Sequence, residues 1–352
     1  MIVETVRTTV RELVDGLSQR PHGRYTEDLP EMSLPSSPRK LTMRRLTCLI
    51  IVAAMLLVLD GNTATAADKV FPDAKLEAVI KAILKKKQAK TDKINEADLK
   101  NIFFLEAPGK GITSLSGLEK CPNLALINLS KNTIVDLKPL AGLKNVQSLD
   151  LSGNKIADVA SLAKLEKLQY LQLEGNQIAK LDGLAGLKKL SALYLSKNKV
   201  ASVAPLKGLG KLSSLYLDGN QVADLSPLKD LKWVANLALR NNQVKDLGPL
   251  AGMTELRYTF LEGNKITDLG PLVTMAQKDA KGGRRFAPYW HLYVAGNPLS
   301  GTAKTGQVAA LKKVGVRVDP KPKAKPKAKP KAKAKAKAKA KAKAKPKAAK
   351  KK

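Results

Sequence analysis

Aromatic side chains are few in this sequence, and most of the tyrosines fall on two series of positions that advance by 22 residues, and once by 33. One series begins at Asn128 and the other at Leu126, and both alternate with leucines. Because side chains alternate between the two faces of a strand, we expect both series to point to solvent. They carry five of the seven tyrosines, one phenylalanine and one histidine, namely Tyr170, Tyr194, Tyr216, Tyr258, Phe260, His291 and Tyr293. Exposed aromatic residues gathered on a rigid surface are typical of sites that bind a protein or a glycan.

A structural interpretation of the same rows stays open, because aromatic residues also pair well across neighbouring strands. Our hypothesis is that the seven side chains form a ligand surface. A third row, two places further along each repeat, is mixed and undecided: Ser130, Ser152, Glu174, Ser196, Asp218, Arg240 and Glu262. Thr259 occupies a leucine position and Trp290 flanks the last strand, so we expect irregular packing there.

No group of residues predicts catalysis. The sequence has two histidines, His22 and His291, and neither belongs to a Ser/His/Asp set or a cluster of metal ligands. The glycines at 208 and 210 are a lone pair inside a repeat rather than a phosphate-binding loop. Cys48 lies in an apolar segment, and Cys121 is expected to be a small buried residue. We therefore predict a non-enzymatic protein with no cofactor and no metal site.

A recurring asparagine defines the elements that must position the aromatic rows. It returns at Asn132, Asn154, Asn176, Asn198, Asn220, Asn242, Asn264 and, after a longer step, Asn297. The pattern L-x-x-L-x-L precedes each asparagine, and a fixed period of roughly 20–29 residues is the signature of a leucine-rich solenoid. We expect each strand to bury its leucines and each asparagine amide to pair with backbone groups that the following turn leaves open, forming a buried ladder.

The fold class predicted is an α/β solenoid, a leucine-rich-repeat horseshoe with a parallel concave sheet. Residues 68–101 should form an N-terminal helical cap, in which Pro72 suits the first helical turn and Asn95 starts a second short helix. Residues 102–319 should hold the repeats and a C-terminal cap, beginning with a degenerate repeat that has Lys110 in the asparagine place. The motif D-L-x-P-L after each strand predicts one helical turn capped by its aspartate.

Two features are expected at the C-terminal end of the repeats. Eleven extra residues, around 275–288, contain several lysines and arginines and predict a basic loop on the convex or flank side, either a binding element or a solvated loop. A helix over 307–313 and a short strand over 316–318 should close the array.

The frame L-x-x-L-x-L-x-x-N-x-I-x-D-L-x-P-L resembles the repeats of internalin-type bacterial surface proteins. The lead-in Phe71-Pro72-Asp73, the stretch 117–124 and the closing Asn297-Pro298-Leu299 are similar as well. The resemblance covers roughly residues 70–319 and implies a curved, non-enzymatic scaffold that binds a partner through its concave sheet. The sequence departs from that family in having no wall-sorting signal or wall-binding module and in its lysine-rich end, so attachment to a host receptor does not carry over.

An export signal is predicted near the N-terminus. Leu46–Leu59 is an apolar run that follows two arginines and precedes Ala64-Thr65-Ala66, so residues 43–67 have the layout of a secretory signal peptide. Residues 1–42 show no period and are predicted to be a disordered leader, which an upstream start codon would explain. The alternative is a single-pass signal anchor. Export would place the protein in the periplasm, on the cell surface or outside the cell.

The C-terminal residues 320–352 form a Lys/Ala/Pro tail that should be disordered. It contributes 17 lysines and no acid to a net charge of +33. Such a tail predicts contact with an anionic polymer, namely an envelope polysaccharide, an anionic lipid surface or nucleic acid. The alternative is that the tail only increases solubility. The residues assigned to polyanion binding are Lys321, Lys323, Lys325, Lys327, Lys350, Lys351 and Lys352.

Taken together, the sequence predicts an exported monomer that binds a protein or glycan on its sheet and holds anionic envelope material with its tail. The alternative is a nucleic-acid-associated protein that acts mainly through the tail.

Overall fold

The structure is a computed structural model that describes residues 69–87 and 94–319, all within one compact unit. The predicted leader 1–42, signal peptide 43–67 and tail 320–352 lie outside the described residues. Among the helices that are described, none combines the length and the apolar character needed to cross a bilayer.

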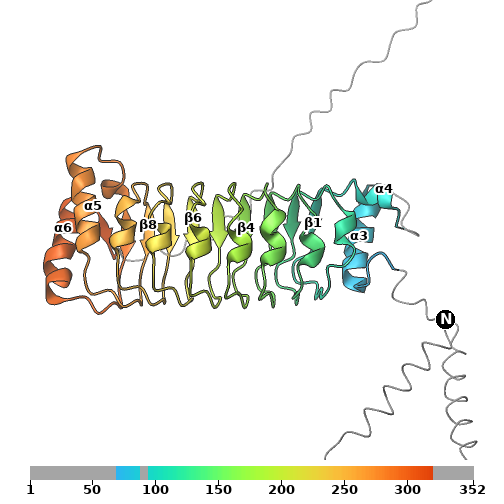
Figure 1. Ribbon diagram of the computed structural model, residues 1–352, viewed down its shortest axis with the longest axis horizontal. Coiled ribbons are helices and arrows are strands. Elements are labelled where there is room, and N and C mark those ends of the chain that lie inside the picture. Colours follow the sequence, from blue (N-terminus) through green and yellow to red (C-terminus); the bar gives the residue numbers. More distant parts are fainter. Residues whose placement is uncertain (1–68, 88–93, 320–352) are drawn as a thin grey trace, which may run out of the picture. The chain divides into compact units, whose positions relative to one another are not determined.

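The described residues form a solenoid in which ten short parallel strands make one sheet, ordered as in the chain (Figure 1). From β1 to β8 each strand pairs in register with residues 22 places on, as Tyr170 does with Ala192, whereas β8 and β9 pair at a step of 33 residues and β9 and β10 at a step of 26. The strands are β1 (Phe104–Glu106), β2 (Leu126–Asn128), β3 (Ser148–Asp150), β4 (Tyr170–Gln172), β5 (Ala192–Tyr194), β6 (Ser214–Tyr216), β7 (Asn236–Ala238), β8 (Tyr258–Phe260), β9 (His291–Tyr293) and β10 (Arg317–Val318).

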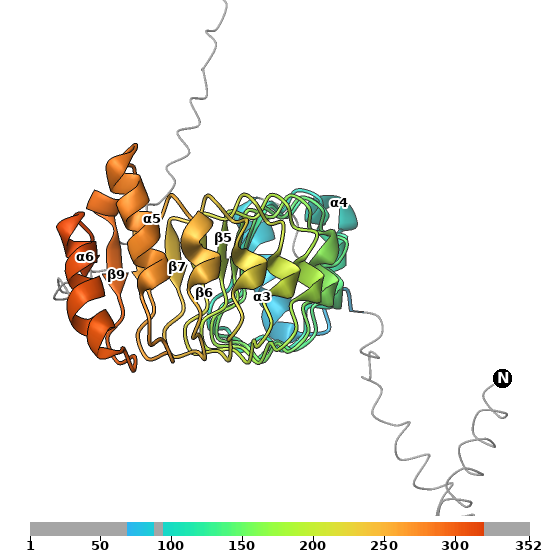
Figure 2. The same cartoon turned by 60° about the vertical axis from the view of Figure 1, so that its left-hand side comes forward.

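A short helical turn follows each of the strands β2 to β7, and the turns stack in a layer separate from the sheet (Figures 1 and 2). The predicted single turns are confirmed as 3-10 segments, and the aspartate of the D-L-x-P-L motif accepts from the N–H two residues on, at 2.9 Å for Asp136 and 2.8 Å for Asp224. The segments are η2 (Leu118–Lys120), η3 (Lys138–Leu140), η4 (Ala160–Lys164), η5 (Asp182–Leu184), η6 (Ala204–Leu206), η7 (Ser226–Leu228) and η8 (Gly248–Gly252).

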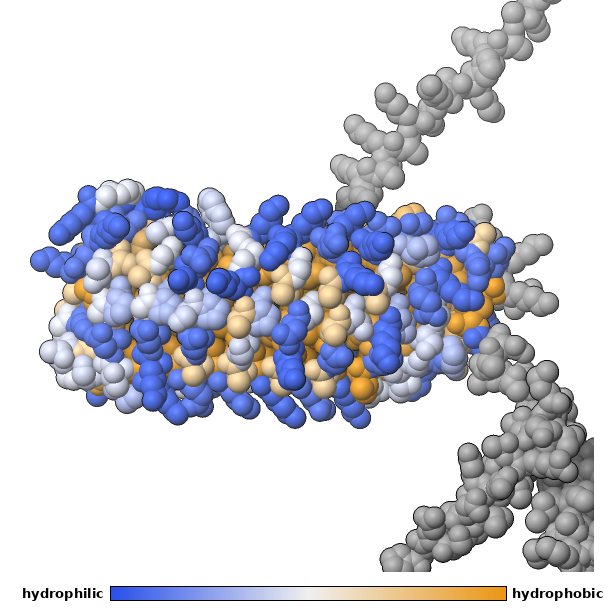
Figure 3. All heavy atoms as spheres, viewed as in Figure 1, coloured by the Kyte–Doolittle hydropathy of each residue, from blue (hydrophilic) through white to orange (hydrophobic). Residues whose placement is uncertain are grey.

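The core is a column of aliphatic layers between the sheet and the turns. In each full repeat the leucines of the L-x-x-L-x-L pattern and the aliphatic residue after the asparagine are buried, as Leu168, Leu171, Leu173 and Ile178 are. Figure 3 shows hydrophilic side chains extending from both edges of the coil, with hydrophobic residues visible between them. Neighbouring layers therefore stabilise one another, because no single repeat could bury its apolar face alone.

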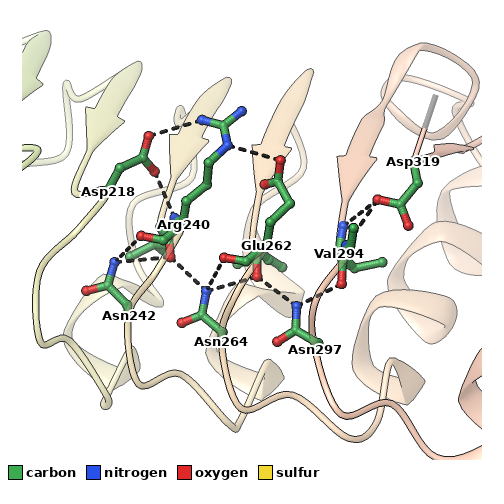
Figure 4. A network of polar contacts seen from close by, with 11 residues as sticks. Asp218, Arg240, Asn242, Glu262, Asn264, Val294, Asn297 and Asp319 are labelled. Carbon is green, nitrogen blue, oxygen red and sulfur yellow. Dashed lines mark hydrogen bonds and ion pairs between the residues drawn. The ribbon is translucent and has the colours of Figure 1, made fainter. Parts of the chain in front are cut away.

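The asparagine ladder is confirmed, and it ties each repeat to the one before it. Asn176 donates from Nδ2 to the carbonyls of Leu173 and Leu151, both at 3.0 Å, and its Oδ1 accepts from the N–H of Ile156 at 3.0 Å. The Leu173 carbonyl also accepts from Asn198 at 2.9 Å, so successive asparagines share acceptors along the column. Figure 4 shows the last rungs of this ladder. Asn132 to Asn264 are buried, whereas Asn297 makes the same contacts while only partly buried.

The predicted N-terminal helical cap consists of α3 (Ala74–Lys86) and α4 (Glu96–Leu99). The expectation that Pro72 stands in the first helical turn is wrong, because Asp73 is the N-cap and the helix begins after it. One Asp73 oxygen accepts from Lys75 and Leu76 of the helix, and the other accepts from Thr113 and Ser114 of the first repeat. Burial raises the pKa of this carboxyl, but the hydrogen bonds outweigh it and lower the pKa to about 2. Asp73 thus joins the cap to the solenoid.

The extra residues after β8 are mostly helix, so the predicted basic loop over 275–288 is wrong in its first half. Helix α5 (Gly270–Lys281) replaces the short turn and buries Leu272, Met275 and Ala276. These residues are three and four positions apart, the spacing of one face of a helix. Only the segment after Lys281 is a loop, and the Asp279 carboxylate fixes it by accepting from the N–H groups of residues 285, 286 and 287. Segment η9 (Ala287–Tyr289) then leads into β9.

The irregular packing expected at Thr259 and Trp290 takes the form of one buried contact. Both side chains are fully buried, and the indole N–H of Trp290 donates to the Thr259 hydroxyl at 2.9 Å. The buried indole N–H of Trp290, in the longer repeat, needs a hydrogen-bond acceptor, and the hydroxyl of threonine at this leucine position supplies it. After β9, η10 (Ala303–Gln307), α6 (Val308–Lys313) and β10 close the array at the predicted place.

Replacing Asn176 with alanine tests the ladder. The change removes three hydrogen bonds and leaves the Ile156 N–H without an acceptor, so we expect a loss of about 3 kcal/mol in the free energy of unfolding. Urea unfolding followed by circular dichroism measures it. The exposed neighbour Gln177 provides the control, since Gln177→Ala should change stability by less than about 0.5 kcal/mol. Equal effects of the two substitutions would contradict the ladder.

Candidate binding surface on the sheet

The outward residues of the strands form a surface, which we call the sheet face. Three rows make it up: the first residue of each strand, the third residue, and the residue two places beyond. The strand register places the seven predicted side chains on the first two rows, in two groups that lie on β4 to β6 and on β8 and β9. Two positions differ from expectation, because Asn128 and Ala238 are buried.

The sheet face extends one strand further than the sequence rows indicated. Phe104 begins β1, pairs in register with Leu126 of the first row, and is 65% exposed. Sequence reasoning missed it because the first repeat lacks the asparagine that marks the frame. Counting back 22 residues from Leu126 would have found it.

Three tyrosines form a stacked group, which we call the tyrosine ladder. The ring centroids of Tyr170 and Tyr194 are 5.3 Å apart, and those of Tyr194 and Tyr216 are 4.8 Å apart and nearly parallel, at 17°. All three rings are half-buried, so each presents an edge or a face to solvent. Strand spacing alone brings residues of one row to about this distance.

A second group, the C-terminal aromatic cluster, lies on β8 and β9. The rings of Phe260 and Tyr293 stack at 4.8 Å, and His291 meets Tyr258 edge-on at 4.8 Å. Tyr258 is 42% exposed. The His291 ring also lies 2.9 Å, through Nε2, from a guanidinium nitrogen of Arg317.

Arg240, from the undecided third row, stands between the two aromatic groups. Its guanidinium contacts Asp218 and Glu262, at 3.0 Å each (Figure 4). The centre of the guanidinium lies 3.8 Å from the ring centroid of Phe260. Ala238, in the neighbouring row of β7, is fully buried beneath its neighbours. Two carboxylates and a ring fix the orientation of a partly exposed guanidinium on the sheet face.

Burial keeps the tyrosine hydroxyls protonated well above neutral pH. Burial, followed by the charges of Tyr194 and Asp150, raises the pKa of Tyr170 to about 12. Burial also raises the pKa of Tyr194, Tyr216 and Tyr293. The sheet face therefore offers neutral hydroxyl groups that can both donate and accept hydrogen bonds.

Two buried oxygens on the sheet face have no hydrogen-bond partner among the described residues. They are Oε1 of Gln172, which lies between Asp150 and Tyr194 in the second row, and Oε2 of Glu262. Leaving a buried acceptor unpaired costs about 1–3 kcal/mol. Both atoms are enclosed by neighbouring groups, so they are not contact points for a ligand.

Catalytic chemistry finds no support in this geometry. Within residues 69–87 and 94–319, no three His, Cys, Asp or Glu side chains are placed to hold a metal ion. Cys121 is buried, and burial raises the pKa of its thiol to about 12, so it is not a nucleophile at neutral pH. The lysines predicted to bind polyanions lie outside the described residues.

The fold and its aromatic sheet face define the class as a leucine-rich-repeat binding scaffold. A family described as Leucine Rich repeats (2 copies) matches residues 144–186. An internalin (inlF) from Listeria monocytogenes is similar at 28% identity over 71% of this chain and 71% of that chain, with a TM-score of 0.61. Internalin C2 of the same organism is 34% identical over 58% of this chain and 91% of that chain, with a TM-score of 0.55. The chain belongs to the internalin-like family of leucine-rich-repeat proteins.

Membership confirms the resemblance and two of its consequences. The internalin family is non-enzymatic, and its leucine-rich-repeat face implies protein binding. The functional domain of InlJ from Listeria monocytogenes shares the fold at 22% identity, over 69% of this chain and 54% of that chain, with a TM-score of 0.50.

The raised tyrosine pKa values predict a loss of stability at alkaline pH. A folded-state pKa of about 12 for Tyr170 against an ordinary value of 10.0 means that the folded protein keeps a proton that the unfolded chain loses. The stabilisation is present below pH 10 and is lost as the pH rises toward 12. Tyrosinate absorbance of the protein minus that of a Tyr170→Phe variant should show one hydroxyl titrating near the upper value. A difference curve centred at the ordinary value would mean that Tyr170 is solvated.

Proposed function

We propose that the protein is exported and binds a protein partner on its sheet face, through the tyrosine ladder and the C-terminal aromatic cluster. The observation that carries this proposal is the stacking of Tyr194 on Tyr216 in half-buried positions of the sheet. Aromatic side chains immobilised in this way present a large contact area and lose little entropy on binding. A glycan is the second ligand class that such rings suit, since sugars also stack on aromatic faces.

The aromatic rows are not needed to build the sheet. Strands β2 and β3 pair in the same register with Asn128 and Asp150 at equivalent positions, and their aliphatic residues Ile127 and Leu149 are equally buried. Cross-strand pairing of aromatic rings adds stability of about 0.5–1.5 kcal/mol per pair, but it gives no reason for the rings to gather on β4 to β6 and again on β8 and β9. Binding supplies that reason.

The polar groups around the rings suit a protein partner better than a purely apolar one. Arg240 and the tyrosine hydroxyls offer donors and acceptors beside the rings. Interfaces that combine tyrosine and arginine in this way concentrate their binding energy in a few central residues. We place that centre at Tyr194, Tyr216 and Arg240.

Export and the role of the tail are further parts of the proposal. Membership of a family of bacterial surface and secreted proteins supports reading residues 43–67 as a signal peptide. The 17 lysines after residue 320 support contact with anionic envelope polymers. The alternative is a nucleic-acid-associated protein that acts through its tail. It explains the same positive charge but assigns no function to the sheet face.

Comparative capture tests the binding surface. We would immobilise the protein, a Tyr194→Ser/Tyr216→Ser variant and a Lys180→Ser/Lys199→Ser control, whose changes lie on exposed residues after the strands. Extracellular and surface proteins retained by each would be quantified by mass spectrometry. We expect a partner that is retained by the first and third proteins and reduced at least about tenfold on the second, because the rings form its anchor.

Melting temperatures of the three proteins complete the test. The serine variant should unfold within a few degrees of the parent, since the leucine layers and the asparagine ladder are unchanged. Identical retention by all three proteins, or a collapse of stability in the serine variant alone, would overturn the assignment.

A further inference from the structure

The sheet face carries the opposite charge from the rest of the chain. The sequence has 63 lysines and arginines against 30 acids. Among the described residues of the three rows, from β1 to Asp319, there are two arginines, no lysine and six carboxylates: Glu106, Asp150, Glu174, Asp218, Glu262 and Asp319. A protein with this composition would place lysines there by chance, so their absence marks a surface suited to a cationic ligand.

The carboxylates lie beside the tyrosine ladder. Asp150 is close enough to Tyr170 to act on its ionisation, and Asp218 is close enough to act on that of Tyr216. Glu174 lies two residues after Gln172. Its carboxylate is 3.0 Å from the Lys197 ammonium, and the Lys197 side chain is largely exposed at the edge of the sheet. An ammonium group placed over the rings would meet ring faces and carboxylates together.

The sheet face already holds one cation in this manner. The Arg240 guanidinium sits over Phe260 and between Asp218 and Glu262. The tyrosine ladder, with Asp150 and Glu174 beside it, offers the same combination of ring and carboxylate with no arginine of its own. Arg240 therefore makes, within the chain, the same contacts with a ring and carboxylates that an external cation would make at the tyrosine ladder.

The chain itself supplies a matching cation. Residues 321–352 begin two places after Asp319, whose carboxylate accepts from the N–H groups of Val294 and Ala295 at the end of the sheet. From residue 331 to 345 lysine alternates with alanine, so in an extended conformation the ammonium groups share one side. Six strand spacings of roughly 4.8 Å separate β10 from β4, about 29 Å. A tail of this length spans roughly 100 Å when extended, so reach is not limiting.

We propose that the lysine-rich tail, residues 321–352, binds back in cis across the tyrosine ladder of its own sheet face. Lysine side chains lie over Tyr194 and Tyr216 and pair with Asp150 and Glu174, while alanines and prolines face outward. The tail then competes with the partner of the sheet face, and an anionic polymer that takes up the tail frees the face. This inference rests on the proposed function of the sheet face and adds its regulation.

A synthetic peptide of residues 321–352 tests the proposal against four proteins by isothermal titration calorimetry. They are the full chain, the chain truncated after Pro320, and two variants of the truncated chain. Asp150→Asn/Glu174→Gln removes the two carboxylates beside the ladder and keeps their shape. Asp158→Asn/Glu166→Gln removes the same charge from exposed positions outside the three rows.

We expect the peptide to bind the truncated chain and the Asp158/Glu166 control equally. Binding to the Asp150/Glu174 variant should be roughly tenfold weaker, because two ammonium–carboxylate pairs are lost. Binding to the full chain should also be at least roughly tenfold weaker at every protein concentration, because a tethered tail has an effective concentration near the millimolar range. Affinity for the truncated chain should fall as salt is raised.

Equal affinity for all three truncated proteins would overturn the proposal, since it would show charge attraction without a site. If the full chain bound the peptide more weakly as its own concentration rose, and light scattering gave the mass of a dimer, the tail would bind a second copy of the chain. That result would overturn binding in cis. Failure of the peptide to bind would leave the capture experiment on Tyr194 and Tyr216 unaffected. The two proposals therefore fail separately.

Discussion

One carboxamide per repeat determines how this molecule is built. The buried asparagine accepts from the backbone of the preceding repeat and donates to both repeats, so it closes the turn and ties neighbours together in one set of bonds. An apolar residue at this position would leave buried N–H and C=O groups without partners. The leucines around it only fill space, and other aliphatic residues could do so, as Ile178 and Val200 show.

The in-register stacking that the ladder enforces is also the origin of the site. Since each strand sits directly beside its neighbour, residues 22 apart become lateral neighbours, and Tyr194 lies on Tyr216 at 4.8 Å. The sheet contributes rigidity and the rows contribute chemistry. Arg240 shows how closely the two are connected, because its bonds to Asp218 and Glu262 span three consecutive strands. The outward rows are thus free to vary in sequence without disturbing the core, which is why function is read from them.

Features that depend on spacing within one repeat could be predicted from the sequence, whereas contacts between distant residues could not. The repeat frame, the asparagine ladder, the turns after the strands and the exposed aromatic rows follow from spacing alone, and all of them were predictable. Helix α5 was missed because Lys278, Gly282 and Gly283 suggested a loop, although Leu272, Met275 and Ala276 carried a helical spacing. The bond between Trp290 and Thr259 joins residues 31 apart and depends on how the longer repeat folds over β8. Arg240 was left undecided for the same reason, because its partners come from two other repeats.

Native-state hydrogen exchange at the ladder amides tests the central claim most directly. The N–H groups of Ile156, Ile178, Val200 and Val222 each donate to an asparagine oxygen of the next repeat at 2.9–3.0 Å. If these bonds hold the repeats in register, all four amides should exchange only through cooperative opening of the array, with similar and high protection. Exchange at rates close to that of an exposed residue such as Lys180 would show that the repeats are held by leucine packing alone.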